Sequence, residues 1–119
     1  MKRTYETSTF VKEEDEQKVL RELRLGYLNL SDGAFEQAKL NFMLALQYDS
    51  RCADAYWWLM LVKFQIKNED ELEQNPMDYK SAVYLPECES ALKFASDSQL
   101  AKYGDLLDRI IKINEGENY

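Results

Sequence analysis

The side chains that could perform chemistry are few. The sequence contains no histidine, which excludes serine–histidine and cysteine–histidine catalysis, haem ligation by histidine and most zinc chemistry. Two cysteines remain, Cys52 and Cys88. Cys88 follows Pro86 near an expected helix start, a place that lowers the pKa of a thiol, but the flanking Glu87 and Glu89 oppose that effect. We therefore expect no reactive thiol.

Neighbouring acidic residues could in principle act as a paired acid and base. They stand at expected helix starts or in a polar stretch, where acids are typically solvated and favour the helix N-terminus. These groups are Glu13/Glu14, Glu69/Asp70/Glu71 and Glu87/Glu89. The four glycines form no phosphate-binding loop, and Asp105 and Asp108 lack calcium-loop spacing. We expect neither an enzyme nor a protein with a metal or cofactor.

Length and charge exclude further classes. The chain has 119 residues, which suits one domain. With 22 acidic and 15 basic residues its net charge is -7, so we expect no direct nucleic-acid binding and no acidic membrane surface as partner. The apolar run 56–62 is too short to span a bilayer, and residues 1–18 lack the apolar region of a signal peptide. We expect a cytoplasmic protein with reduced, buried cysteines, although one disulfide between them stays open.

The spacing of apolar residues predicts helices throughout, with no convincing strand, so the predicted class is all-α. The expected main helices span residues 12–30, 34–48, 53–66, 86–95 and 97–114. Asn68 with Glu71 could cap a short helix, and Ser96 with Gln99 forms a capping box for the last one. We expect residues 74–84 to form a loop. Residues 1–10 are expected to be frayed.

Residues 19–52 contain a helix, a turn and a second helix within about 34 residues, the period of a helical solenoid. Small and aromatic residues stand where the two helices would cross and where the next pair would stack. They are Leu25, Gly26, Gly33, Phe35, Ala38, Phe42, Ala45, Leu46 and Asp49. This pattern resembles the tetratricopeptide repeat. Gly26 and Ala38 would let the helices approach closely, and Phe42 would fill the space before the next repeat.

Residues 53–95 resemble a degenerate second repeat, in which Met60 replaces the usual Gly or Ala and Ser50 the usual Pro. The segments 55–61, 67–72 and 91–96 are similar to the tail of certain bacterial tetratricopeptide-type proteins. The resemblance implies that residues 1–119 form a single domain, with residues 97–114 as a C-terminal capping helix. The implied architecture is a short right-handed solenoid of antiparallel helix pairs with about five main helices.

In such solenoids the first helix of each pair lines the concave side. The resemblance implies a partner-binding face made of Leu20, Leu23, Arg24, Tyr27, Asp54, Trp57, Trp58, Leu61 and Phe64. Leu23 and Trp57 stand where a carboxylate clamp would need basic residues, so we expect an apolar or amphipathic segment of a protein partner instead. Tryptophan and tyrosine are frequent anchors of such contacts.

Several alternatives stay open. An aromatic stripe at helical spacing is often core, and the C-terminal helix could fold back and fill the groove with its own apolar stripe. That stripe is Leu100, Tyr103, Leu107, Ile110 and Ile111. Two copies could pair, because a short solenoid needs its ends covered. A different function is that of an acidic inhibitor or decoy that occupies a basic nucleic-acid-binding surface of a partner.

Overall fold

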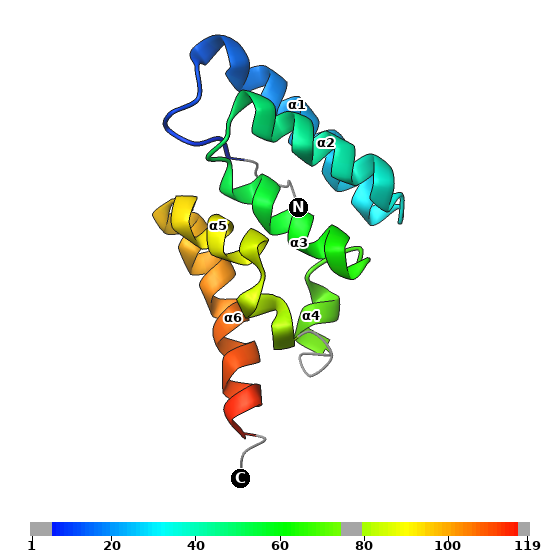
Figure 1. The fold of residues 1–119 in the computed structure, drawn as a ribbon, viewed down its shortest axis with the longest axis vertical. Helices are drawn as coiled ribbons and strands as arrows, with labels where there is room; N and C mark the ends of the chain where they lie inside the picture. Colours follow the sequence, from blue (N-terminus) through cyan, green and yellow to red (C-terminus); the bar gives the residue numbers. More distant parts are fainter. Residues whose placement is uncertain (1–5, 75–79, 117–119) are drawn as a thin grey trace.

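The computed structural model describes residues 6–74 and 80–116, and these residues form helices and no strand, as the sequence predicts. The elements are α1 (Glu13–Ser31), α2 (Phe35–Tyr48), α3 (Ala53–Phe64), α4 (Asp70–Gln74), the 3-10 helix η1 (Lys80–Tyr84), α5 (Pro86–Phe94) and α6 (Asp97–Gly116). The fold is elongated, 53 × 29 × 28 Å, with the α1–α2 pair at one end and α6 at the other (Figure 1).

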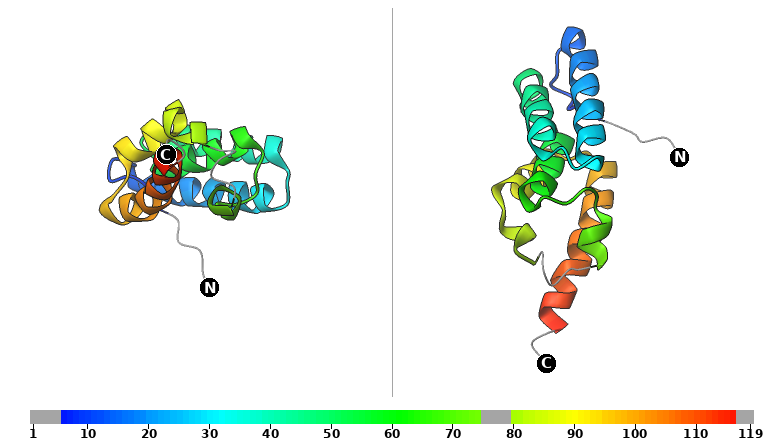
Figure 2. Two further views of the ribbon diagram at one scale, coloured as in Figure 1. Left: turned by 90° about the horizontal axis from the view of Figure 1, so that it is seen from below. Right: turned by 90° about the vertical axis from the view of Figure 1, so that its right-hand side faces the viewer.

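Helices α1 and α2 form an antiparallel pair (Figure 2). Gly33 lies in the turn with φ of 80°, a conformation that glycine adopts without strain. Gly26 faces Phe42 so closely that a Cβ atom there would lie under 3.0 Å from three carbons of the ring. The close crossing expected from Gly26 is therefore present, and Phe42 reaches on to Trp58 of α3, with 5.6 Å between the ring centroids.

Helix α3 is the centre of the fold. It contacts α2 on one side and α5 on the other, which explains why its sequence is apolar on nearly every side. It ends at Phe64, two residues before the expected end, because Gln65 adopts the left-handed conformation with φ of 57° and ψ of 45°. Ile66 then folds back into the core, where it is 1% exposed.

The helix caps of the C-terminal half follow the sequence, while the expected loop does so only in part. The Asp70 N–H donates to Asn68 Oδ1 at the start of α4. The Ser96 N–H donates to Gln99 Oε1 at 2.8 Å, and the Gln99 N–H donates back to Ser96 Oγ, which confirms the capping box. Within the expected loop 74–84, residues 80–84 form η1 instead, and 75–79 lie outside the described residues.

Hydrogen bonds hold the N-terminal segment against the rest of the fold. Ser8 donates its N–H to Asp49 at 2.7 Å, and the Glu6 N–H donates to Asp54 Oδ2 at 3.2 Å. This segment is therefore attached rather than frayed, because Asp49 at the end of α2 and Asp54 at the start of α3 accept the backbone N–H groups of Ser8 and Glu6. Residues 1–5 lie outside the described part.

Along the fold, α1 packs on α2, α2 on α3 and α3 on α5. Helices α4 and η1 lie between α3 and α5 in the sequence, and α6 packs against both of them. Six α-helices thus pack against one another in the described part of the chain. In that part, no helix has both the length and the apolar character needed to cross a bilayer.

Candidate interaction surfaces

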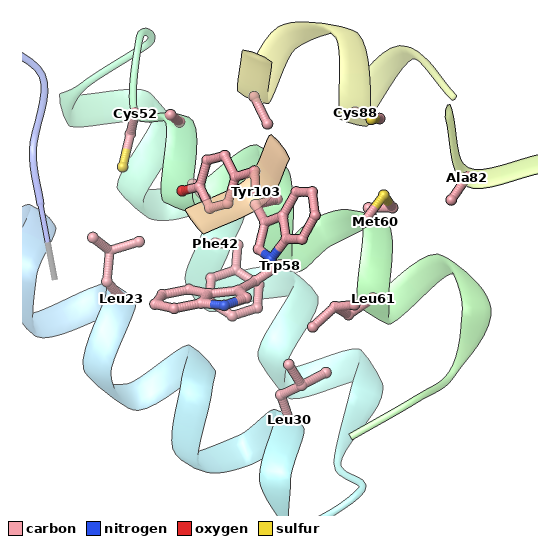
Figure 3. Close-up of a cluster of buried hydrophobic side chains, with 14 of the residues drawn as sticks. Leu23, Leu30, Phe42, Cys52, Trp58, Met60, Leu61, Ala82, Cys88 and Tyr103 are labelled. Atoms are coloured by element: carbon pink, nitrogen blue, oxygen red, sulfur yellow. The ribbon is translucent and has the colours of Figure 1, made fainter. Parts of the chain in front are cut away.

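Five of the nine predicted partner-binding residues are at most 2% exposed: Leu23, Asp54, Trp57, Trp58 and Leu61. They lie in the core instead of on a surface. Figure 3 shows Trp58 beside Phe42, with Leu23 and Leu61 around them. Such side chains offer no surface to a partner in this conformation. Leu20, Tyr27 and Phe64 are half-buried, and Arg24 is exposed.

Tyr103 of α6 covers part of the predicted face. Its ring stacks on Trp57, with 4.4 Å between the centroids and an interplanar angle of 13°. Tyr103 and Ile110 are buried and Leu107 is 4% exposed, whereas Leu100 remains 41% exposed; the side chain of Ile111 lies outside the described residues. The C-terminal helix thus covers Trp57, as the alternative interpretation of the aromatic stripe expected.

Asp54 is a buried acid whose carboxylate accepts hydrogen bonds from two distant parts of the chain. Tyr103 donates its hydroxyl to Asp54 Oδ1, and the Glu6 N–H donates to the other oxygen. Burial raises the pKa of Asp54, and these hydrogen bonds oppose the rise. Burial also raises the pKa of Tyr103, with the nearby carboxylate adding to the effect. The tyrosine therefore stays protonated and ties α6 to α3.

The two cysteines and Glu69 also have surroundings that hold the fold together and do not activate them for chemistry. Both cysteines are free and buried, and burial raises the pKa of Cys52 to about 12 and that of Cys88 to about 11. Glu69 Oε1 accepts the indole N–H groups of Trp57 and Trp58, each at 3.3 Å. Among the described residues, no group of His, Cys, Asp or Glu side chains could hold a metal ion.

A groove of about 550 Å³ lies between α2, α3 and the start of α5. Met43 and Leu46 from α2 and Leu59 and Val62 from α3 supply its apolar lining. The charged lining residues are Glu36, Lys39, Lys63 and Glu87. The groove is therefore amphipathic, and Tyr27 is not among its lining residues.

Glu87 gives the groove a specific polar group. Its Oε1 accepts from Lys63 Nζ at 3.1 Å, while its Oε2 is buried and has no hydrogen-bond partner among the described residues. A buried carboxylate oxygen without a donor is costly. Of the two carboxylate oxygens of Glu87, it is Oε1 that has a described partner, at the α5 edge of the groove.

A second apolar surface lies on the side of the α1–α2 pair that faces away from α3. Leu28 of α1 is 52% exposed, and Leu40, Leu44 and Tyr48 of α2 are 56%, 39% and 39% exposed. We call this surface, together with the half-buried Leu25, the outer face. The sequence indicates both surfaces, because α2 has three apolar residues outside its buried stripe of Ala38, Phe42 and Ala45. These residues are Leu40, Met43 and Leu44.

Comparisons of the chain with protein families, with curated proteins and with solved structures found no match in any of the three. The interpretation of the chain therefore depends on its own residues and geometry.

Proposed function

We propose that this protein is a non-catalytic, tetratricopeptide-like interaction module that binds an amphipathic segment of a partner protein in the groove between α2, α3 and α5. The observation that supports the proposal best is the groove itself, in which four apolar side chains are surrounded by charged ones. Apolar pockets with a polar rim are typical of sites that bind peptide segments.

The lining suggests what the segment carries. Met43, Leu46, Leu59 and Val62 would bury apolar side chains, and methionine adapts its shape to irregular partners. The negative charge of Glu87 favours a hydrogen-bond donor or a basic side chain at the α5 edge of the groove. The segment is therefore expected to place an apolar stripe inward and a donor beside it.

The buried aromatic residues support a different role from the one the sequence suggested for them. Trp57 and Trp58 hold α3 against its neighbours. Their contribution to binding would be indirect, through the position of Leu59 and Val62 on the same helix.

Peptides selected from a random displayed library against the full chain test this proposal. We expect the selected peptides to bind Met43→Glu at least about tenfold more weakly than the unchanged protein, which corresponds to about 1.4 kcal/mol. Leu44→Glu is the matched control, because it adds the same charge one residue further along α2 on the outer face. Fluorescence anisotropy with a labelled peptide gives both affinities.

Peptides that bind Met43→Glu as tightly as the unchanged protein would refute the groove. Binding that disappears between low and moderate salt, with no effect of Met43→Glu, would instead support the acidic decoy, since long-range charge attraction is screened by salt.

A further inference from the structure

The outer face of the α1–α2 pair carries exposed apolar side chains from both helices. No described helix covers this side of the antiparallel pair (Figures 1 and 2). Tyr27, which contacts Trp58 at 5.5 Å between ring centroids, marks the side of the pair that faces α3. The apolar residues of the outer face point the other way, and Leu40 and Leu28 are more than half exposed. Surfaces of this kind commonly mark contacts between proteins.

Polar contacts fix how the two helices lie beside each other on this face. Asn29 Nδ2 donates to Asn41 Oδ1 at 2.8 Å, and Lys18 Nζ lies 5.3 Å from the centre of the Tyr48 ring. Leu25 is four residues before Asn29, and Leu44 is three residues after Asn41. Because the helices are antiparallel, Leu25 and Leu44 lie at the same level along the pair.

On each helix, residues that could pair across a two-fold axis are spaced equally before and after Leu25 or Leu44. On α1, Lys18 and Asp32 stand seven residues before and after Leu25, two helical turns in each direction on the same side. On α2, Leu40 and Tyr48 stand four residues before and after Leu44. A two-fold axis across both helices at this level would place Lys18 opposite Asp32 of a second copy, and Leu40 opposite its Tyr48.

The charges favour this arrangement. Asp32 is the exposed C-terminal cap of α1, and the last turn of that helix has no basic residue. A negative charge at a helix C-terminus is unfavourable, because the helix dipole is negative there. Lys18 of a second copy would supply the missing positive charge, and its own link to Asp15 is weak, with 3.7 Å between the charged atoms.

We propose that the outer face is the two-fold interface of a homodimer, in which α1 packs antiparallel to α1, and α2 to α2, of a second copy. A two-fold contact uses the same surface twice and so must be self-complementary. The pairs Lys18–Asp32 and Leu40–Tyr48, with Leu25 and Leu44 on the axis, meet that condition. The interface is separate from the groove and does not depend on the function proposed for it.

Sedimentation equilibrium of the full chain at about 0.1 mM tests the proposal, since a contact with a Kd of about 10 μM would then be mostly dimeric. We expect twice the chain mass. Leu44→Glu should produce monomers, because it places two carboxylates together on the axis. Met43→Glu, the same change at a position 48% exposed on the groove side of α2, should remain dimeric. Circular dichroism confirms that each variant is folded.

Charge reversal tests the register. Lys18→Glu and Asp32→Lys should each weaken the dimer by about tenfold or more, because each brings like charges together across the axis. The variant with both changes should regain the dimer, since the opposite charges then meet again. A monomeric wild type, a dimer indifferent to Leu44→Glu, or a double variant no better than the single ones would each overturn the proposal.

Discussion

The buried pair of Tyr103 and Asp54 offers a sharp test of the core. Tyr103→Phe removes one hydroxyl and keeps the ring, so the stack on Trp57 remains while the carboxylate loses a donor. Asp54 is 2% exposed, so water cannot replace that donor without opening the structure. The change therefore isolates a single hydrogen bond that joins α6 to α3.

The expected loss in the free energy of unfolding is about 1.5–3 kcal/mol at a pH where Asp54 is ionised, the range for a buried hydrogen bond to a charged group. It should fall toward about 0.5–1.5 kcal/mol once Asp54 is protonated, because the bond then joins neutral groups. The direction follows from the hydrogen bond of Tyr103, which favours the charged form of Asp54 and lowers its pKa, against the rise that burial causes. The folded state holds the proton more firmly than the unfolded chain, so this group costs stability as pH rises through its folded pKa.

Urea unfolding followed by tryptophan fluorescence, at acidic and neutral pH, measures these differences. Asp54→Asn is the matched background, because its side chain has no charge to titrate and Tyr103→Phe should there cost less, with no pH dependence. A loss below about 0.5 kcal/mol at both pH values would mean that the hydrogen bond contributes nothing measurable, and the description of this pair would be wrong.

Three further predictions follow from the core. Gln65→Gly should raise the free energy of unfolding by about 0.5–1 kcal/mol, because glycine adopts the positive φ at the end of α3 without strain; Gln65→Ala, measured by urea unfolding beside it, should give no such gain. Cys52 and Cys88 should react with a thiol reagent only after unfolding, because both are buried with pKa values of about 12 and 11; fast labelling of the folded protein would contradict this. Trp57→Ala should cost about 3–5 kcal/mol in thermal or urea unfolding, as a core truncation does, whereas a fully stable variant would place Trp57 on the surface.

Local sequence signals predicted the helices and their caps well. The turn at Gly33, the close approach at Gly26 and the capping box at Ser96 depend on residues near one another in the chain, so their types and spacing were enough. The 3-10 helix at 80–84 was missed, because one short turn carries no periodic apolar pattern.

The orientation of α3 could not be predicted in the same way. Its sequence is apolar on nearly every side, so periodicity gives no information about which side meets solvent. Which side of α3 is buried depends on α5 and α6, which begin more than twenty residues after α3 ends. It depends also on Glu6, whose backbone N–H donates to Asp54 from 48 residues away. The tryptophans therefore suggested a binding face that the structure places inside.

The most direct test of the proposed interaction module is the map of backbone amide shifts when a selected peptide is added to the labelled protein. The account predicts that the largest shifts cluster at the groove residues Met43, Leu46, Leu59 and Val62, with Glu87 at their edge. Shifts centred instead on Leu20, Arg24 and Tyr27 of α1 would contradict the proposed groove and place the binding site on α1.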